Sequence, residues 1–343
     1  MVKAIPEFGK NILASTLNGF DDYILVTMEE PWVLLEPLVD NEPIKIIYNH
    51  DMSLTHLERL ERDTKVPATS VVGFGGGTAC DTAKYLAWKW QLPLITAPSI
   101  ISVDAWLCTS IAVRHDHKVR YIGNVEPRRV LVDLELIKQA PPSLNRAGIS
   151  DTISICTALG DWLIAHEIFD DRFDRKVFNQ AKDIVNELMA AASDIKEVND
   201  AGIRAMVKGF VDEVNLCEGW GDARPEEGGE HFLAYCLEEI TRDHYIHGNL
   251  IGLNVLIVLQ LQKDKAVFPV KALKSFFDDI ELQYSPISQG ITRDDFKQAL
   301  ESVQQYVRTE NLANGLWSLE NVFDDSGPCS VNGILDWIYS FST

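Results

Sequence analysis

The sequence has no long hydrophobic run of the kind that an export signal or a membrane span requires. Its first fifteen residues, MVKAIPEFGKNILAS, contain no continuous apolar core followed by a small-residue cleavage pattern. The most apolar segment, Leu250–Gln262, is too short to cross a bilayer, and it carries Asn254 and two glutamines. We therefore expect a cytoplasmic protein without a membrane partner.

Cysteine is scarce and scattered. The six cysteines are Cys80, Cys108, Cys156, Cys217, Cys236 and Cys329. None of them belongs to a C-x-x-C pair, so the sequence indicates neither a zinc–cysteine site nor a disulfide framework. We interpret all six as buried, reduced thiols.

Basic residues are also few. Lysine and arginine number 31 against 51 aspartates and glutamates, which gives a formal charge of −20. Such a long-range field repels phosphate groups and excludes a general nucleic-acid or anionic-membrane binder. A small anionic substrate is still compatible with this charge, because a local pocket can oppose the global sign.

Internal repeats and low-complexity linkers are absent as well. The chain has 343 residues, of which 46% are hydrophobic and 24% charged. This composition is that of a globular protein and argues against disorder. At roughly 150 residues per domain, the length predicts about two domains.

The first part of the chain alternates short β-rich runs with helix-length stretches. The predicted strands are Tyr23–Thr27, Ile44–Tyr48, Ser70–Phe74, Leu94–Ala97 and Val130–Asp133. Short, apolar, β-branched runs with this spacing indicate buried parallel strands in βα units. Between Ile111 and Ile122, two polar-alternating arms predict a β-hairpin with a turn of three or four residues.

After Arg146 almost every segment has the helical period. The predicted helices are Asp151–Phe169, Lys176–Val198, Gly202–Leu216, His231–Thr241, Gly248–Gln262 and Thr292–Val307, the last with Thr292 as its N-cap. We therefore predict an α/β nucleotide-binding domain over 1–146 and an all-helical domain over 147–343. A cleft between two such domains is where a cofactor and a substrate commonly meet.

A glycine-rich loop, GFGGGT at 73–78, directly follows a predicted strand and opens a helix. Glycines let backbone N–H groups approach a pyrophosphate, and the helix N-terminus adds positive potential. Thr78 stands where a dinucleotide fingerprint has its third glycine, so the loop is not G-x-G-x-x-G. We predict a phosphate-binding loop, with a purely structural turn as the alternative. Asp81 could equally be a first-turn helix acid that the helix dipole favours.

Three residues of the helical half form a candidate metal site: Asp151, His231 and His247. Asp151 starts a predicted helix, His231 follows a glycine-rich turn, and His247 precedes the most apolar helix. One carboxylate and two imidazoles suit a divalent metal with an open position. Because ligands so far apart in sequence could pair in many ways, core or capping histidines remain the alternative at this point.

Seven motifs occur together in one order. They are GGGxxxDxxK at 75–84, PxxxAPS at 93–99, Ser102-Val-Asp104-Ala105, AGxxD at 147–151, GDWxxAH at 160–166, Glu230-His231 and His247-Gly248. In this combination the chain resembles the iron-containing alcohol dehydrogenase and dehydroquinate synthase superfamily. Within it, the chain is most similar to sn-glycerol-1-phosphate dehydrogenases and glycerol dehydrogenases.

The resemblance implies a dehydroquinate synthase-like fold, in which an N-terminal Rossmann-like parallel-sheet domain binds NAD or NADP and an all-helical C-terminal domain holds a divalent metal. The implied cofactor residues are Gly75, Gly76 and Gly77 against the pyrophosphate, with Asp81, Thr96 and Ser99 along the cofactor. The implied metal ligands are Asp151, His231 and His247. Asp104 is the implied catalytic residue, which hydrogen-bonds a substrate hydroxyl; a loop aspartate that caps local backbone is the alternative.

Departures from the family pattern bear on the metal. Family members with four iron ligands carry a histidine four residues after the aspartate, and this chain has Ile155 there. Three protein ligands with a free fourth position favour Zn²⁺, with Fe²⁺ and Ni²⁺ as alternatives.

Other departures bear on the substrate. Dehydroquinate synthases carry V-D-S-S-V-G-G-K-T where this chain reads VDAWLCTS at 103–110, which disfavours a carbocycle synthase. Ser102-Val-Asp104-Ala105 is nearer the S-T-D-A of glycerol dehydrogenases than the S-H-D-G of glycerol-1-phosphate dehydrogenases, whereas GDWxxAH favours the phosphate-using group. We therefore expect hydride transfer to or from a polyol or hydroxyketone, with sn-glycerol 1-phosphate and dihydroxyacetone phosphate first. An unphosphorylated polyol, a carbocycle synthase and a non-enzymatic nucleotide-binding regulator are the alternatives.

Two sets of charged residues complete the prediction. Glu29 and Glu30 follow the first predicted strand, where an acid would hydrogen-bond a ribose hydroxyl and favour NAD. The candidate cations for a substrate phosphate are Arg114, Lys118, Arg120 and Arg146, with solvated surface charges as the alternative. We further expect a homo-oligomer, with the number of subunits left open.

Overall fold

The computed structural model describes residues 4–115 and 118–341, and the chain divides into two compact units. An α/β unit comprises Val2–Asn145 and Val198–Ile203, and a helical unit comprises Arg146–Glu197 and Arg204–Thr343. The short segment 198–203 therefore groups with the α/β unit, although its neighbours in sequence belong to the helical one. Domains over 1–146 and 147–343 stay our proposal.

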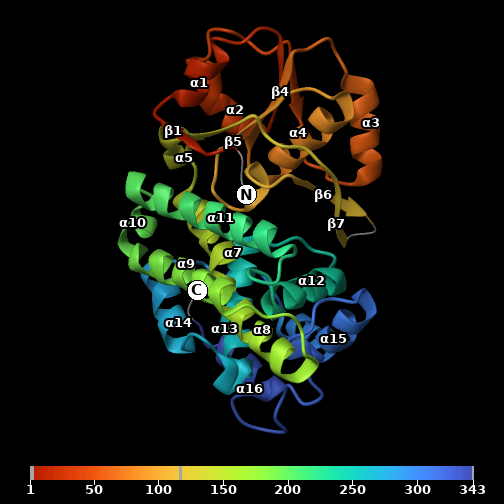
Figure 1. The fold of residues 1–343 in the computed structure, drawn as a ribbon, viewed down its shortest axis with the longest axis vertical. Coiled ribbons are helices and arrows are strands. Elements are labelled where there is room, and N and C mark those ends of the chain that lie inside the picture. The colour runs from red at the N-terminus through yellow and green to blue at the C-terminus, as the bar shows by residue number, and fades with distance from the viewer. Residues whose placement is uncertain (1–3, 116–117, 342–343) are drawn as a thin grey trace. The chain divides into compact units, whose positions relative to one another are not determined.

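The α/β unit is built on a sheet that includes β4 and β5 (Figure 1). This sheet has six strands in the order β1-β8-β5-β4-β2-β3. All of its strand pairs are parallel. The strands are β1 Glu7–Gly9, β2 Tyr23–Thr27, β3 Lys45–Tyr48, β4 Ser70–Gly75, β5 Leu94–Pro98 and β8 Arg129–Asp133. The five predicted strands are confirmed. The prediction missed β1, because three residues are too few to show a period.

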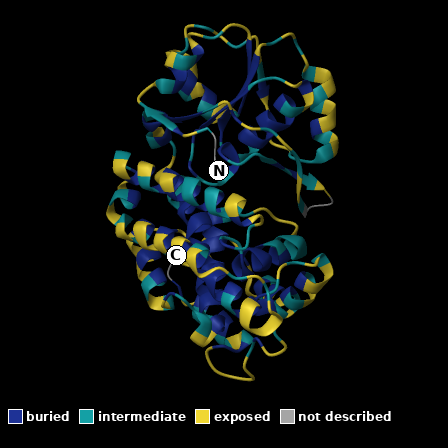
Figure 2. Cartoon of the chain, viewed as in Figure 1, coloured by how far each residue is buried: buried dark blue, intermediate teal, exposed yellow. Residues whose placement is uncertain are grey.

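Helices cover both faces of this sheet, as expected when neighbouring parallel strands are joined by helical crossovers. The side chains of β2 alternate, so that Tyr23 and Leu25 join one core while Ile24 and Val26 join the other. The first core includes residues of α1 Ile12–Leu17, α2 Glu29–Leu35 and α5 Leu134–Gln139; the second includes residues of α3 Leu54–Thr64 and α4 Gly77–Trp90. The four inner strands, β2, β4, β5 and β8, are accordingly buried between two helical layers (Figure 2).

A separate antiparallel hairpin packs beside α4. Its arms are β6 Ser110–His115 and β7 Lys118–Asn124, and they pair from Ser110 with Asn124 to His115 with Lys118. Ile111 and Val113 point into the core that α3 and α4 share. The hairpin is confirmed, whereas the predicted turn falls at 116–117, outside the described residues.

The rest of the chain is helical, with short 3₁₀ turns. The remaining helices are α6 Pro142–Ala147, α7 Ile149–Ile153, α8 Ile155–Phe169, α9 Arg175–Ala190, α10 Ala192–Glu197, α11 Asp200–Trp220, α12 Gly229–Thr241, α13 His247–Gln262, α14 Val270–Asp279, α15 Arg293–Glu310 and α16 Val331–Ile338. The 3₁₀ turns are η1 Glu36–Leu38, η2 Asp104–Trp106, η3 Lys263–Lys265 and η4 Leu316–Ser318. Among the described residues, no helix combines the length and the apolarity that crossing a bilayer requires.

Two of the predicted helices are each divided into two shorter helices in the structure. The predicted helix 151–169 is interrupted at Ser154, whose hydroxyl bonds the carbonyls of Asp151 and Glu226 and so competes with the helical ladder. The predicted helix 176–198 is interrupted near Ala191, and α10 ends before Val198, which has a positive φ of 48°. The predicted N-cap of α15 is confirmed, because the Thr292 hydroxyl accepts the Asp295 N–H at 3.2 Å.

The core of the helical unit is organised around α13. Nearly every residue of this helix is buried, from Gly248 to Gln262, so the helix is buried all round instead of on one stripe. It packs against α7, α8, α12 and α14. The first residue of this buried helix is His247.

Candidate metal centre and cofactor loop

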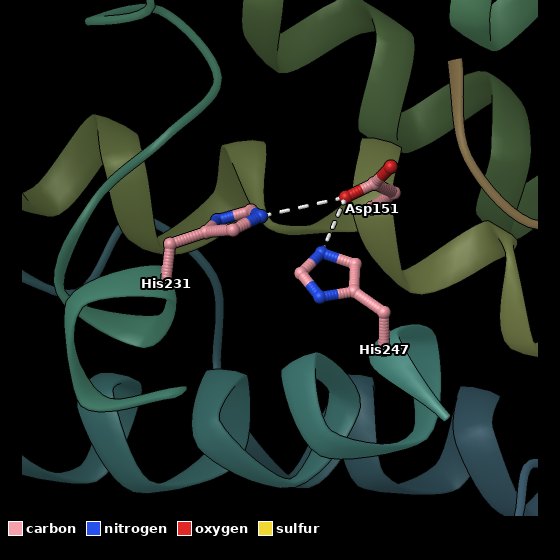
Figure 3. Close-up of side chains that lie close together, drawn as sticks. All are labelled: Asp151, His231 and His247. Carbon is pink, nitrogen blue, oxygen red and sulfur yellow. Dashed lines mark ion pairs between the residues drawn. The ribbon is translucent and has the colours of Figure 1, made fainter. Parts of the chain in front are cut away.

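Three helices bring the predicted metal ligands together (Figure 3). Asp151 lies in α7, His231 in the first turn of α12, and His247 at the start of α13. The Asp151 Oδ1 atom lies 3.4 Å from Nε2 of His231 and 3.3 Å from Nε2 of His247. The three ligand atoms all lie within 4.8 Å of one another. Residues remote in sequence thus point at one place in the helical unit.

The electrostatics of this cluster favour positive charge between the side chains. Burial alone would raise the pKa of the Asp151 carboxyl, but hydrogen bonds with His231 and His247 outweigh burial and hold that pKa well below its ordinary value. Burial would likewise lower the pKa of His231, yet Asp151 and Glu230 raise it well above its ordinary value. The donor set also fits a divalent cation, since a carboxylate oxygen and two imidazole nitrogens are the ligands that Zn²⁺ and Fe²⁺ accept. Ile155 is fully buried and offers no donor.

Glu230 orients His231 from behind. Its Oε1 lies 2.9 Å from Nδ1 of His231 and also accepts the Gly228 N–H at 2.8 Å. Its Oε2 accepts the Thr157 hydroxyl at 2.5 Å. A carboxylate bound to one imidazole nitrogen fixes the tautomer and leaves the other nitrogen for a metal. Glu230 belongs to a sequence motif with His231, but the motif alone predicts no role for it. Its place directly before a candidate ligand is the signal that the sequence offers.

Gly248 lets α13 approach the segment that carries Asp151. A Cβ at this position would lie 1.8 Å from the carbonyl oxygen of Ala147. No side chain can be accommodated at that distance from backbone. The glycine after His247 therefore has a packing reason, because it allows His247 and Asp151 to meet.

The glycine loop lies between β4 and α4 of the α/β unit. Cβ atoms at Gly73 and Gly75 would come within 2.7 Å and 2.6 Å of the Cβ atoms of Ala83 and Ala79, so glycine permits close packing of this strand on this helix. The N-cap of α4 is Gly76, and the first turn carries no acidic residue. The backbone N–H groups at this helix start are therefore uncapped by side chains and suited to an anion.

Thr96, Ser99 and Asp104, which the resemblance assigns to cofactor or substrate, form hydrogen bonds within the α/β unit. The Thr96 hydroxyl donates to the Trp106 carbonyl at 2.6 Å, and the Ser99 N–H donates to the Gly75 carbonyl at 3.0 Å. Asp104 opens η2, where its carbonyl accepts the N–H groups of Leu107 and Cys108. Their roles toward cofactor and substrate stay predictions. Asp104 and the predicted cofactor residues belong to the α/β unit, whereas the three metal ligands belong to the helical unit.

Asp81 forms a buried ion pair that the sequence did not predict. Its Oδ1 lies 2.7 Å from Nζ of Lys84 and also accepts the Ala112 N–H at 3.2 Å. The Lys84 side chain is 0% exposed, and its ammonium donates to the Ser110 carbonyl at 2.5 Å. Although burial acts to lower the pKa of Lys84, the Asp81 carboxylate raises it above its ordinary value. The pair thus ties α4 to β6.

Replacing Lys84 with methionine should destabilise the protein by about 3–5 kcal/mol, because the change leaves the buried Asp81 carboxylate without its cation. Urea unfolding measures the effect. Lys89→Met is the matched control, since Lys89 lies on the same helix but is exposed, and we expect a change within about 0.5 kcal/mol. Equal stability of the Lys84→Met and wild-type proteins would contradict a structural role for the pair.

The comparisons with known proteins agree with this picture. A family model described as iron-containing alcohol dehydrogenase matches residues 39–141. The glycerol-1-phosphate dehydrogenase [NAD(P)+] of Hyperthermus butylicus is 30% identical over 211 residues, covering 61% of this chain and 60% of that protein. The chain is a relative of the iron-containing alcohol dehydrogenases. The resemblance read from the sequence motifs is thereby confirmed.

Other relatives and solved structures extend the match within this superfamily. The glycerol-1-phosphate dehydrogenase [NAD(P)+] of Pyrococcus furiosus is 26% identical over 267 residues, 74% of this chain and 77% of its own. A probable glycerol dehydrogenase from Sinorhizobium meliloti 1021 superposes with a TM-score of 0.70 at 19% identity, covering 99% of this chain and 98% of that one. This structural likeness confirms the predicted fold class. The chain spans about three fifths of the length of the Hyperthermus relative.

Proposed function

We propose that this protein is a metal-dependent dehydrogenase that transfers hydride between NAD(P) and a small polyol or hydroxyketone. The observation that carries the proposal is the convergence of Asp151, His231 and His247 on one place, in a relative of the iron-containing alcohol dehydrogenases. The relatives named glycerol-1-phosphate dehydrogenase [NAD(P)+] support sn-glycerol 1-phosphate and dihydroxyacetone phosphate as the first substrate pair to test.

The division of labour follows from the residues. A divalent metal, when bound, is a Lewis acid that polarises a substrate oxygen, and NAD(P) is the hydride carrier. Asp151 supplies the negative charge of the ligand set, and Glu230 holds His231 so that its Nε2 faces Asp151. The uncapped start of α4 would bind the cofactor pyrophosphate. Asp104 would accept a hydrogen bond from the substrate hydroxyl and orient it for transfer.

Zn²⁺ is the proposed metal and NAD the proposed cofactor. Ile155 contributes no fourth ligand, and a three-ligand set with an open position is typical of catalytic zinc. Glu29 starts α2 directly beyond β2, near the strand end where a ribose hydroxyl is bound in dinucleotide folds. Its Oε2 also lies 2.9 Å from Nε2 of His50, so the acid is partly engaged in this structure.

An unphosphorylated polyol is the second candidate substrate, and one observation favours it. Of the four cations proposed for a substrate phosphate, Arg146 is already committed: it donates to Glu281 at 2.6 Å and to the Lys196 carbonyl at 2.9 Å. The motif Ser102-Val-Asp104-Ala105, which is nearer to the glycerol dehydrogenase pattern, also favours an unphosphorylated polyol.

The test is a substrate screen with the purified protein and added Zn²⁺. The oxidation of NADH and NADPH is followed by absorbance with dihydroxyacetone phosphate and with dihydroxyacetone, and the reverse reaction with glycerol 1-phosphate and glycerol. We expect reduction of the phosphorylated ketone with NADH. Turnover of the unphosphorylated pair alone would favour the second candidate. Release of phosphate from dihydroxyacetone phosphate without a net absorbance change would instead indicate cleavage of the phosphate ester and overturn the proposal.

A further inference from the structure

A buried carboxylate, Asp161 of α8, holds the turn that precedes His231. Asp161 is 1% exposed. Its Oδ2 accepts the Gly229 N–H at 2.7 Å, which is the first residue of α12. Its Oδ1 accepts the Leu316 N–H at 3.1 Å and the Gln262 side-chain amide at 2.8 Å. One side chain therefore joins α8, α12, the end of α13 and η4.

Gly229 is held at both ends of the residue. While Asp161 accepts its N–H, the indole N–H of Trp317 donates to its carbonyl at 2.7 Å. The turn leaves no spare room around the carboxylate: Cβ atoms at Gly228 and Gly229 would each lie 3.1 Å from its Oδ2. These hydrogen bonds and close contacts restrict the backbone geometry at the start of α12.

The residues that follow Gly229 are Glu230 and the proposed ligand His231. Glu230 reaches back to the Gly228 N–H and across to the hydroxyl of Thr157, which lies one helical turn before Asp161 on α8. Gln262 bridges Thr157 and Asp161, because its side-chain amide donates to the Thr157 carbonyl at 2.7 Å and to the Asp161 carboxylate. The contacts run without a break from Asp161 through the turn to the imidazole.

Stability alone does not account for this arrangement. Burial, reinforced by the nearby Glu230 carboxylate, raises the pKa of Asp161 to about 6, so ionising this group in the folded protein is costly. Buried charged groups are weak contributors to net stability, and apolar packing commonly replaces them without loss. A costly group that is satisfied on three sides is better explained by the geometry it imposes.

We propose that Asp161 is a positioning residue for the metal centre. It holds the Gly228–Gly229 turn so that Glu230 and His231 have the orientation that metal binding requires. Asp161 acts on His231 through the backbone of α12, whose first N–H it accepts. The inference rests on the proposed metal site of the proposed function.

The test compares Zn²⁺ affinity, measured by competition with a chelator, in the wild-type protein and in Asp161→Asn. The Asp161 carboxylate accepts three N–H groups, whereas the NH₂ of asparagine cannot accept any and faces at least one of them. The turn should therefore shift, although the size of the side chain does not change. We expect Zn²⁺ binding to weaken by about 10–100-fold, the range typical of groups that orient ligands. The absorption spectrum of the Co²⁺-loaded protein should change as well, since it reports ligand geometry.

Asp133→Asn is the matched control. Asp133 is also 1% exposed, and its carboxylate accepts backbone N–H groups of Asn11, Leu13, Glu135 and Leu136, but it lies in the α/β unit. We expect this variant to lose thermal stability and to keep the wild-type Zn²⁺ affinity and Co²⁺ spectrum. A general loss of stability therefore does not imitate the expected result.

Trp317→Phe is the second variant. It tests whether the Gly228–Gly229 turn positions His231 even if Asp161→Asn does not fold. It removes the N–H that holds the Gly229 carbonyl, together with part of the buried indole ring. From the lost hydrogen bond we expect Zn²⁺ binding to weaken roughly fivefold. Wild-type Zn²⁺ affinity and Co²⁺ spectrum in folded Asp161→Asn would overturn the positioning role while leaving the metal site intact. Absence of Zn²⁺ binding by the wild-type protein would overturn the proposed function together with it.

Discussion

Replacing His247 with alanine is expected to abolish metal binding and turnover together. The Nε2 atom of His247 lies 3.3 Å from Oδ1 of Asp151, and its removal leaves two protein ligands where three converge. Since groups that merely orient ligands are worth about 10–100-fold in metal affinity, loss of a ligand should cost more than about 100-fold. Elemental analysis of the purified variant measures the metal, and NADH absorbance measures the turnover.

His244→Ala is the control for this experiment. His244 lies three residues before His247, in the exposed segment between α12 and α13, and it is no part of the proposed site. We expect this variant to retain both metal and activity. A fully active, metal-replete His247→Ala protein would remove His247 from the proposed ligand set.

Replacing Gly248 with alanine is expected to unfold the metal centre and much of the helical unit's core. The added Cβ would lie 1.8 Å from the carbonyl oxygen of Ala147, and backbone on both sides would have to move apart. Because α13 is buried along its length, this displacement disturbs the core as well as the distance between His247 and Asp151. We expect a loss of more than about 4 kcal/mol of unfolding free energy, measured in urea, together with loss of Zn²⁺ binding.

Gly219→Ala is the matched control, with an effect of opposite sign. Gly219 lies in α11, and no described atom comes within 4 Å of a Cβ built there. Alanine favours a helix over glycine by about 0.5–1 kcal/mol, so this variant should be slightly more stable than wild type. If Gly248→Ala were equally well tolerated, the close approach of α13 to Ala147 would not be a requirement of the fold.

The predictable part of the fold is the part with a local period. The runs at Tyr23–Thr27 and Ser70–Phe74 are apolar and β-branched, and burial between two layers of helices requires that composition whatever the neighbours are. The boundaries that failed depend on contacts remote in sequence. At the helix break the Ser154 hydroxyl bonds the carbonyl of Glu226, and β1 is a strand because β8 pairs with it.

The candidate site likewise has a part that the sequence predicts and a part that depends on contacts remote in sequence. The residue types at Asp151, His231 and His247, and the glycines beside them, were legible in the chain and in the order of its motifs. That Glu230 holds His231, that Asp161 holds the turn before it, and that Asp81 is paired with Lys84 depends on side chains brought together from different helices and strands.

The sequence by itself determined the alternation of buried strands and helices, the change to an all-helical region, and the chemical kinds of the proposed ligands. These follow from local periodicity and from the identity of side chains. Only the tertiary structure decided that His231 and His247 meet at the Asp151 carboxylate and that position 248 has no room for a side chain. The reason is that the distances between α6, α7, α12 and α13 are set by how the whole helical core packs.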